Sequence, residues 1–502
     1  MILIFPPVTK PCEPPAGVSL LAGALGLHGR PCTVIDANIE GLLWVADHND
    51  HPRDSWTRRA WVRYGRNLED LRSPEVYAAP DTYRQRIMDV NRVLSTSLSG
   101  RYRLTLSDYT DTLLSPLDSR DLIRAAQTFE ENPFFGYFEE SLASMIQASD
   151  SNTVGISLVY LSQALTAFAL AGWIRVRFPG KTIVMGGGLI TSWMSSPAWV
   201  NPFREIVDIL VPGEGEAAVV DLEGGGFKPR DHWTPDFDFC RWDLYLAPGR
   251  ILPFRTSFGC YWSRCSFCPE RAEKSRYRPG KNSDLLADLE TLHSRHRFHY
   301  VHFLDNALSP SFLKAIAGQA MPFCWYGFVR FTPQLKDPEF CQALYRSGCR
   351  MLNLGLESGD QEVLDRMNKG TDLDTASAIL TALSGAGIAT YVYVLFGTSY
   401  ENEASAEKTL EYVARHADRI SYLNTAIFNL PRFSEEADTL STGSFYTGDL
   451  SLYLSFTHPL GWERKNVRLF LERRFKKHPA IAAVIRRDPP FFTSNHAMFL
   501  KS

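Results

Sequence analysis

The chain has 502 residues, of which 45% are hydrophobic and 22% charged, and this composition excludes a mainly disordered or collagen-like protein. Its 53 Lys and Arg residues nearly balance its 56 Asp and Glu residues, so no overall positive charge favours nucleic acid, and we expect no nucleic-acid partner. The sequence contains no run of about 18 or more uninterrupted apolar residues, so we expect no transmembrane helix. Nine cysteines, sparse and odd in number, with no apparent signal peptide, indicate free or metal-bound thiols in a reducing cytoplasm.

The first part of the chain alternates strand and helix patterns, which is typical of a parallel α/β sheet. Helices are expected at residues 17–29 and 163–177, and a polar stretch over about 45–149 predicts a helical insertion. We therefore predict a doubly wound domain over residues 1–222. Its strands are expected at residues 1–5, 32–36, 153–159, 182–185 and 206–211.

A second α/β series follows residues 223–249, whose glycines, prolines and isolated aromatics without a period predict a linker. Six strand patterns separated by helices over residues 250–430 predict a partial (β/α)6 barrel with its site at the carboxyl ends of the strands. The remaining residues 431–502 form a small C-terminal region with a basic amphipathic stretch. The barrel strands are expected at residues 254–257, 300–304, 325–330, 351–356, 391–396 and 419–426.

Three cysteines follow the first strand of this second series. Cys260, Cys265 and Cys268 have the spacing C-x4-C-x2-C. Thiolates are soft ligands that suit iron–sulfur clusters and zinc. Three of them can hold three corners of a four-iron cluster and leave the fourth iron open, whereas structural zinc usually takes four protein ligands. No fourth Cys or His is close in sequence, so the pattern favours a cluster over a zinc site or coincidence.

The barrel region resembles the radical S-adenosylmethionine (radical SAM) superfamily, whose usual spacing is C-x3-C-x2-C. The resemblance rests on the cysteines and on three further motifs in chain order. These are His302-Phe-Leu-Asp-Asn306 after the second strand, Gly355-Leu-Glu-Ser-Gly359 with Met367-Asn-Lys-Gly370 after the fourth, and Val394-Leu-Phe-Gly397 with Glu401 after the fifth. Thr398 and Ser399 depart from the usual fifth-strand residues.

This resemblance implies roles for particular residues. Cys260, Cys265 and Cys268 are expected to ligate a [4Fe-4S] cluster whose open iron binds the amine and carboxylate of SAM. Asp305 and Glu357 are the expected catalytic residues, and Glu357 and Gly397 are expected to bind SAM.

The first domain resembles the cobalamin-binding domain that precedes many radical SAM domains. Glycines at the ends of parallel strands allow backbone to approach a corrin closely, although they would equally serve a nucleotide or tight turns alone. The cobalt-binding motif Asp-x-His-x-x-Gly is absent, which predicts cobalamin without a protein His ligand. The expected cofactor-binding residues are Ser157, Gln163, Gly186, Gly187, Gly188, Gly213, Glu214, Gly215 and Glu216.

Together the two resemblances imply an enzyme that reductively cleaves SAM to a 5′-deoxyadenosyl radical and methylates an unactivated carbon with the help of cobalamin. Two alternatives stay open: a radical SAM enzyme that does not methylate, and a non-catalytic iron–sulfur or zinc sensor. The expected partners are an electron donor such as flavodoxin or ferredoxin, and a small-molecule, lipid or peptide substrate.

Overall fold

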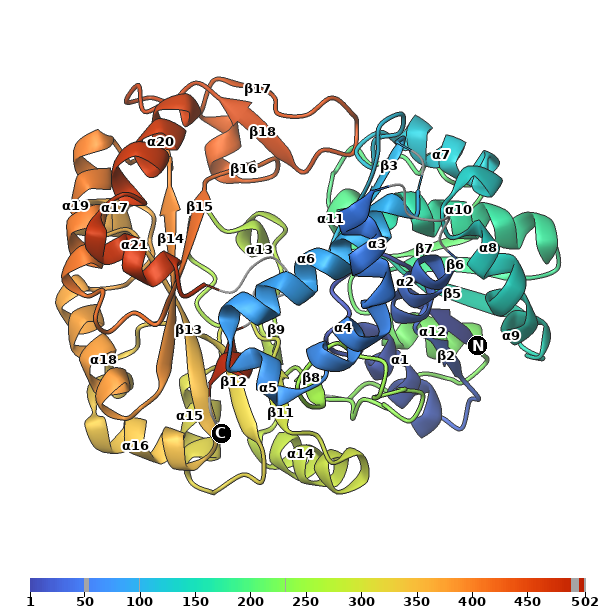
Figure 1. Cartoon of the computed structure of the whole chain (residues 1–502), viewed down its shortest axis with the longest axis horizontal. Helices are drawn as coiled ribbons and strands as arrows, with labels where there is room; N and C mark the ends of the chain where they lie inside the picture. The colour runs from blue at the N-terminus through green and yellow to red at the C-terminus, as the bar shows by residue number, and fades with distance from the viewer. Residues whose placement is uncertain (49–53, 99, 231, 489–495, 501–502) are drawn as a thin grey trace. The chain divides into compact units, whose positions relative to one another are not determined.

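The computed structural model describes residues 1–48, 54–98, 100–230, 232–488 and 496–500 (Figure 1). The chain divides into two compact units. Unit 1 comprises Met1–Arg250 together with Tyr446–Leu452, and unit 2 comprises Ile251–Phe445 and the described residues from Tyr453 onward. Within the described ranges, no helix has both the length and the apolar character needed to cross a membrane.

Unit 1 is built on a five-stranded sheet in which every pairing is parallel. The strand order is β2-β1-β5-β6-β7, so the order reverses between β1 and β5. In open α/β sheets a ligand site lies at the carboxyl ends of the strands beside such a reversal. The strands are β1 (Ile2–Ile4), β2 (Thr33–Ile35), β5 (Thr153–Ser157), β6 (Thr182–Gly186) and β7 (Ile209–Val211).

Apolar helices cover this sheet. In α10 (Leu161–Arg177) almost every residue from Gln163 to Ile174 is buried, which explains why the segment lacks a polar face. A Cβ on Gly172 would overlap the carbonyl of Ala126 in α7 (Ser119–Gln127), so glycine permits the close approach of these two helices. The other helices of this layer are α1 (Ala16–Leu27), α2 (Ala37–Asp47), α11 (Gly188–Met194) and α12 (Glu216–Leu222).

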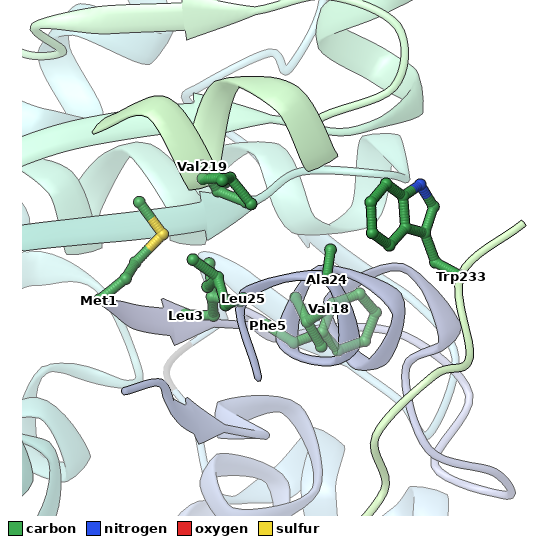
Figure 2. Packing of buried hydrophobic residues seen from close by; sticks show 9 residues of the cluster. Met1, Leu3, Phe5, Val18, Ala24, Leu25, Val219 and Trp233 are labelled. Carbon is green, nitrogen blue, oxygen red and sulfur yellow. The ribbon is translucent and has the colours of Figure 1, made fainter. Parts of the chain in front are cut away.

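Figure 2 shows one core cluster of unit 1, in which β1, α1 and α12 share a single apolar layer. Leu3 of β1 and its flanking residues Met1 and Phe5 pack with residues of both helices. Because β1 is buried on both faces, it reads as the uninterrupted apolar run seen at the start of the sequence. The remaining members of the cluster are Val18, Ala24, Leu25, Val219, Val220 and Trp233.

The predicted insertion is helical, but it also contains a hairpin that the sequence analysis did not predict. Strands β3 (Tyr102–Leu104) and β4 (Tyr109–Asp111) pair antiparallel across a short turn. Residues 49–53 of the insertion lie outside the described residues. Its other helices are α3 (Ser55–Val62), α4 (Tyr64–Leu71), α5 (Pro74–Tyr77), α6 (Pro80–Thr96), α8 (Phe135–Tyr137) and α9 (Ala143–Gln147).

The segment 223–249, expected to be a linker, instead packs against unit 1. Phe237 is fully buried, and Tyr245 donates a 2.8 Å hydrogen bond to Asp36. The backbone N–H of Asp236 donates to the carbonyl of Ser19 at 2.8 Å. The segment shows no helix or strand period because separate aromatic anchors, not regular structure, hold it in place.

Unit 2 contains a six-stranded parallel sheet in the order β15-β14-β13-β12-β11-β8. Its edge strand β8 covers Ile251–Phe254, three residues earlier than predicted, because an edge position tolerates Pro253. The following residues Ser257–Phe258 form β9, which pairs antiparallel with β10 (Arg278–Pro279). The other strands are β11 (Tyr300–Phe303), β12 (Cys324–Val329), β13 (Cys349–Glu357), β14 (Ala389–Phe396) and β15 (Tyr422–Ile427).

Helices separate these strands and complete the predicted α/β alternation of the partial barrel. Several begin with an aspartate or asparagine whose side chain accepts hydrogen bonds from the first turn, as at Asp337, Asp360 and Asn402. The helices are α13 (Pro269–Ala272), α14 (Asn282–His296), α15 (Pro310–Ala317), α16 (Pro338–Arg346), α17 (Gln361–Arg366), α18 (Leu373–Gly385) and α19 (Glu403–Arg415).

The C-terminal region adds a small sheet and two helices. Strands β16 (Leu430–Pro431), β18 (Tyr453–Phe456) and β17 (Thr442–Ser444) form the sheet. Helices α20 (Arg464–Phe470) and α21 (Pro479–Ile485) each bury apolar residues, and α20 exposes Lys465 and Arg468 on its other side. The loop Tyr446–Leu452 belongs to unit 1, where Asp449 accepts hydrogen bonds from the backbone and hydroxyl of Ser119 at 2.8 and 2.7 Å.

Candidate functional site

The three motif cysteines lie on one loop that follows β9, and all three are free thiols. Gly259 has φ +68°, and a Cβ there would lie 2.9 Å from the carbonyl oxygen of Arg276, so glycine allows the chain to turn into the loop. Cys268 ends the loop and precedes α13, whose first residue is Pro269. Burial raises the pKa of the Cys268 thiol to about 11, so a metal must displace its proton to bind.

The cysteine loop is attached to the turn that follows α17. The backbone N–H of Ser266 donates to the carbonyl of Met367 at 3.0 Å, and the indole N–H of Trp262 donates to that of Asn368 at 2.9 Å. Gly370 has φ +66°, and a Cβ on it would overlap the Trp262 ring. The Met-Asn-Lys-Gly segment therefore supports the cysteine loop, and Trp262 is the side chain that attaches the loop to this segment.

A buried ion pair lies at the Met-Asn-Lys-Gly segment. Lys369 Nζ is 2.7 Å from Glu357 Oε1, and the two side chains are 8% and 13% exposed. Glu357 ends β13 in the left-handed conformation, with φ +67°, and a Cβ on Gly355 would lie 2.5 Å from Glu357 Oε1. The motif glycine thus leaves room for the carboxylate and its partner, while contact of Glu357 with SAM stays a prediction.

Asp305 is buried, at 2% exposure, beneath the segment that leads into the cysteine loop. Its carboxylate accepts hydrogen bonds from Thr256 N at 2.9 Å, Thr256 Oγ1 at 2.7 Å and Ser257 Oγ at 2.5 Å. Burial raises its pKa, and these hydrogen bonds oppose that rise. In this arrangement Asp305 fixes the connection from β8 to β9, so its predicted catalytic role remains untested.

Gly397 and Glu401 form a closed turn at the end of β14. Glu401 is fully buried, and its Oε2 accepts hydrogen bonds from Gly397 N and from Trp462 Nε1, the latter at 3.0 Å. Its Oε1 has no hydrogen-bond partner in the described part of the chain. Burial raises the pKa of Glu401 to about 8, so the carboxyl group is largely neutral at pH 7.

In unit 1 the predicted cofactor residues come together along the carboxyl edge of the parallel sheet. Ser157 ends β5, Gly186 ends β6, and Gly213 follows β7. Gly187 has φ +110°, and a Cβ there would overlap the carbonyl of Leu158, so the backbones of two adjacent strand ends touch. The strand order thus gathers these glycines at one edge, although no ligand contact is established for them.

Gln163 has a different position from the one expected of a ligand-binding side chain. It is fully buried, and its Oε1 accepts from the backbone N–H groups of Val159 and Tyr160, both at 3.0 Å. Its Nε2 donates to the carbonyl of Pro6 at 2.7 Å. Gln163 therefore joins the ends of β1 and β5 at the point where the strand order reverses.

The remaining predicted residues of unit 1, Gly188, Glu214, Gly215 and Glu216, occupy the starts of α11 and α12. Glu216 is buried in the first turn of α12, and a Cβ on Gly215 would lie 3.2 Å from the Leu21 side chain. These residues pack the helix starts against unit 1, and their contact with a cofactor stays a prediction.

The donor set at the cysteine loop fits an iron–sulfur cluster. In the described ranges no three His, Cys, Asp or Glu side chains lie close enough together to bind one metal ion. A cluster does not need that geometry, because each thiolate binds a different iron. The Tyr261 hydroxyl in the same loop is buried and has no hydrogen-bond partner among the described residues, which leaves a polar group for a bound species to satisfy.

Sequence reasoning missed two residues of this site. Trp262 and Arg330 hold the cysteine loop through contacts between segments distant in sequence; Trp262 lies within the cysteine motif but was given no packing role, and Arg330 belongs to no motif. A tryptophan inside a lengthened cysteine spacing was the available signal, since an added large side chain needs a place to pack.

Comparisons with known proteins agree with this geometry. Residues 255–413 match the model of the Radical SAM superfamily. The bacteriochlorophyllide d C-12(1)-methyltransferase of Chlorobaculum tepidum is 28% identical over 348 residues, covering 63% of this chain and 73% of that protein. An anaerobic magnesium-protoporphyrin IX monomethyl ester cyclase of Rubrivivax gelatinosus is 23% identical over 36% of this chain and 34% of its own length.

A solved structure extends the likeness in fold to both units. The radical S-adenosylmethionine methyltransferase TsrM from Kitasatospora setae, solved with cobalamin and a [4Fe-4S] cluster bound, matches with a TM-score of 0.53. The match covers 88% of this chain and 77% of that one at 14% sequence identity, so it establishes the fold.

Proposed function

We propose that this radical SAM enzyme, whose radical SAM domain includes residues 255–413, uses cobalamin to methylate an unactivated carbon of its substrate. The observation that carries the proposal is the pairing, in one chain, of a glycine-edged parallel sheet with a barrel that presents three free thiols on one loop. The fold likeness to TsrM and the sequence likeness to a methyltransferase support the same conclusion.

Cys260, Cys265 and Cys268 would hold a [4Fe-4S] cluster, which when bound supplies the electron that cleaves SAM to methionine and a 5′-deoxyadenosyl radical. The protein's own contribution is to position and shield. Trp262 anchors the loop, and Lys369 holds the Glu357 side chain in place through their ion pair, so that Glu357 would be positioned to bind the amine or ribose of SAM.

Cobalamin, when bound, supplies methyl transfer. The carboxyl edge of the unit 1 sheet would hold it, with Gly213, whose Cβ position has no described atom within 4 Å, allowing close approach of backbone to the corrin. The missing Asp-x-His-x-x-Gly motif favours cobalamin without a His ligand from the protein. An electron donor such as flavodoxin or ferredoxin would reduce the cluster in the cytoplasm.

A planar conjugated molecule such as a tetrapyrrole is the first substrate class to test. Two of the relatives described above act on tetrapyrroles by name. In this chain, aromatic rings from β12 and β14, the two strands that flank β13, come together: the ring centroids of Phe328 and Tyr393 lie 5.0 Å apart, and those of Tyr391 and Tyr393 lie 4.6 Å apart. They lie on the opposite face of the sheet from Phe396, which packs against the helical residue Phe475.

The test is anaerobic reconstitution with iron, sulfide and cobalamin, followed by turnover with SAM, a reductant and tetrapyrrole acceptors. We expect a methylated product together with both S-adenosylhomocysteine and 5′-deoxyadenosine, because methyl donation and radical formation each consume SAM. Product with 5′-deoxyadenosine as the only SAM-derived nucleoside would instead support the non-methylating alternative.

A variant with Cys260, Cys265 and Cys268 all replaced by alanine is the matched control. It should lose bound iron and 5′-deoxyadenosine formation together. If the wild-type protein binds iron yet leaves SAM intact under reducing conditions, the sensor alternative takes the place of the enzyme. Loss of cobalamin on gel filtration would contradict the role proposed for unit 1.

A further inference from the structure

Arg330 is a buried cation next to the cysteine loop that the proposed function does not use. It follows β12 and is 9% exposed. Its Nη1 lies 3.7 Å from Cys265 Sγ, and its Nη2 donates to the carbonyl of Lys369. Its guanidinium carbon lies 4.4 Å from the centroid of the Trp262 ring. Three contacts therefore fix both the position and the plane of the guanidinium group.

The positive charge of Arg330 has no carboxylate partner in the described part of the chain, whereas Glu357 balances the nearby Lys369. A buried, unbalanced charge is costly, so a site that retains one is suited to a negatively charged occupant. The atom next to this charge is the sulfur of Cys265, a predicted cluster ligand. A thiolate-ligated cluster brings that negative charge.

We propose that Arg330 is a positioning residue that sets the reduction potential of the cluster through an N–H···S hydrogen bond to Cys265. The cluster accepts one electron from an external donor, which makes it more negative, and the guanidinium stabilises this reduced form more than the oxidised form. Hydrogen bonds to cluster sulfurs are an established determinant of potential. The proposal requires the cluster but is independent of cobalamin and methylation.

Trp262 gives the interaction its direction. The flat guanidinium lies over the indole ring, and the same ring is tied to Asn368 by its own hydrogen bond. An arginine in this position can donate to a sulfur and to a carbonyl at once, whereas a lysine ammonium keeps the charge but cannot reproduce the planar two-point contact. Charge and geometry can therefore be separated by substitution.

The experiment is a redox titration of the reconstituted holoprotein, with the reduced cluster measured by electron paramagnetic resonance. For Arg330→Gln we expect four bound irons and about a tenfold lower ratio of reduced to oxidised cluster at a fixed potential, which equals a midpoint about 59 mV more negative for one electron. Arg330→Lys should fall between this variant and the wild type.

Arg264→Gln is the matched control, because Arg264 also lies over the Trp262 ring, 5.1 Å from its centroid, but is exposed. Its midpoint should equal that of the wild type. An unchanged midpoint in Arg330→Gln, or an equal shift in Arg264→Gln, would overturn the proposal. If Arg330→Gln binds no iron, Arg330→Lys is titrated in its place, and loss of iron from both would assign Arg330 a purely structural role and also overturn it.

Discussion

Replacing Gly370 with alanine should weaken cluster retention, because this glycine supports the tryptophan that locks the cysteine loop. The added Cβ would overlap the Trp262 ring, and the residue would have to keep φ +66°. The Trp262 ring would have to move away from the new Cβ. This movement would remove its hydrogen bond to Asn368 and its contact with Arg330.

The magnitude follows from three contributions. Holding alanine in the left-handed region costs about 1–2 kcal/mol. Loss of the indole hydrogen bond costs about 1 kcal/mol, and loss of the stacked guanidinium about 0.5–2 kcal/mol. The sum of about 2.5–5 kcal/mol corresponds to a shift of roughly sixtyfold or more away from the observed loop conformation.

The assay measures iron per chain and the rate of iron loss to a chelator after anaerobic reconstitution. We expect Gly370→Ala to lose iron at least about tenfold faster than the wild type, which is less than the full shift because the bound cluster itself holds the loop. Gly385→Ala is the control, since Gly385 ends α18 with no atom within 4 Å of the place that a Cβ would take, and it should not change retention. Equal rates of iron loss in all three proteins would refute the role assigned to Trp262.

Three further predictions concern other parts of the site. Replacing Lys369 with methionine leaves the Glu357 carboxylate buried and unpaired, which should destabilise unit 2 by about 3–5 kcal/mol in urea unfolding, and adding Glu357→Gln should recover part of that loss. The pKa of Glu401 is raised from 4.5 to about 8, so its folded form binds more protons than its unfolded form. The contribution of Glu401 to the stability of the fold is therefore fully present below pH 4.5 and is lost as the pH rises to about 8. Over that interval the stability of Glu401→Gln should increase relative to that of the wild type. In unit 1, Gly187→Ala would place an alanine at φ +110° with its Cβ against the backbone of Leu158. Thermal unfolding should therefore show a free energy of unfolding lower by about 3 kcal/mol or more.

Much of the architecture was predictable because strand periodicity and glycine positions are local signals. Strands β5 and β6 begin at Thr153 and Thr182, as expected from their apolar runs. The gathering of strand-end glycines also followed from the parallel order, because parallel strands present their carboxyl ends at one edge. Cys260, Cys265 and Cys268 carried a signal in their spacing alone.

Other features depend on contacts that no local pattern encodes. The hairpin β3–β4 uses short strands inside a polar stretch, and the anchoring of Tyr245 to Asp36 joins residues 209 positions apart. Likewise, the side chains of Gln163 and Asp305 are occupied by backbone and hydroxyl groups that only the folded chain brings to them. The sequence predicted ligand roles for both residues, and the structure adds contacts by which each holds neighbouring backbone in place.

The loop Tyr446–Leu452 has a consequence for the order in which the chain folds during synthesis. Unit 1 includes this loop, whose Leu450 is buried and donates its backbone N–H to the carbonyl of Leu117 at 2.9 Å. Residues 251–445 must leave the ribosome before the loop does, which takes about 10–40 s at typical rates of translation. Throughout that interval the nascent first unit lacks one of its own segments, so its final consolidation follows synthesis of the barrel rather than preceding it.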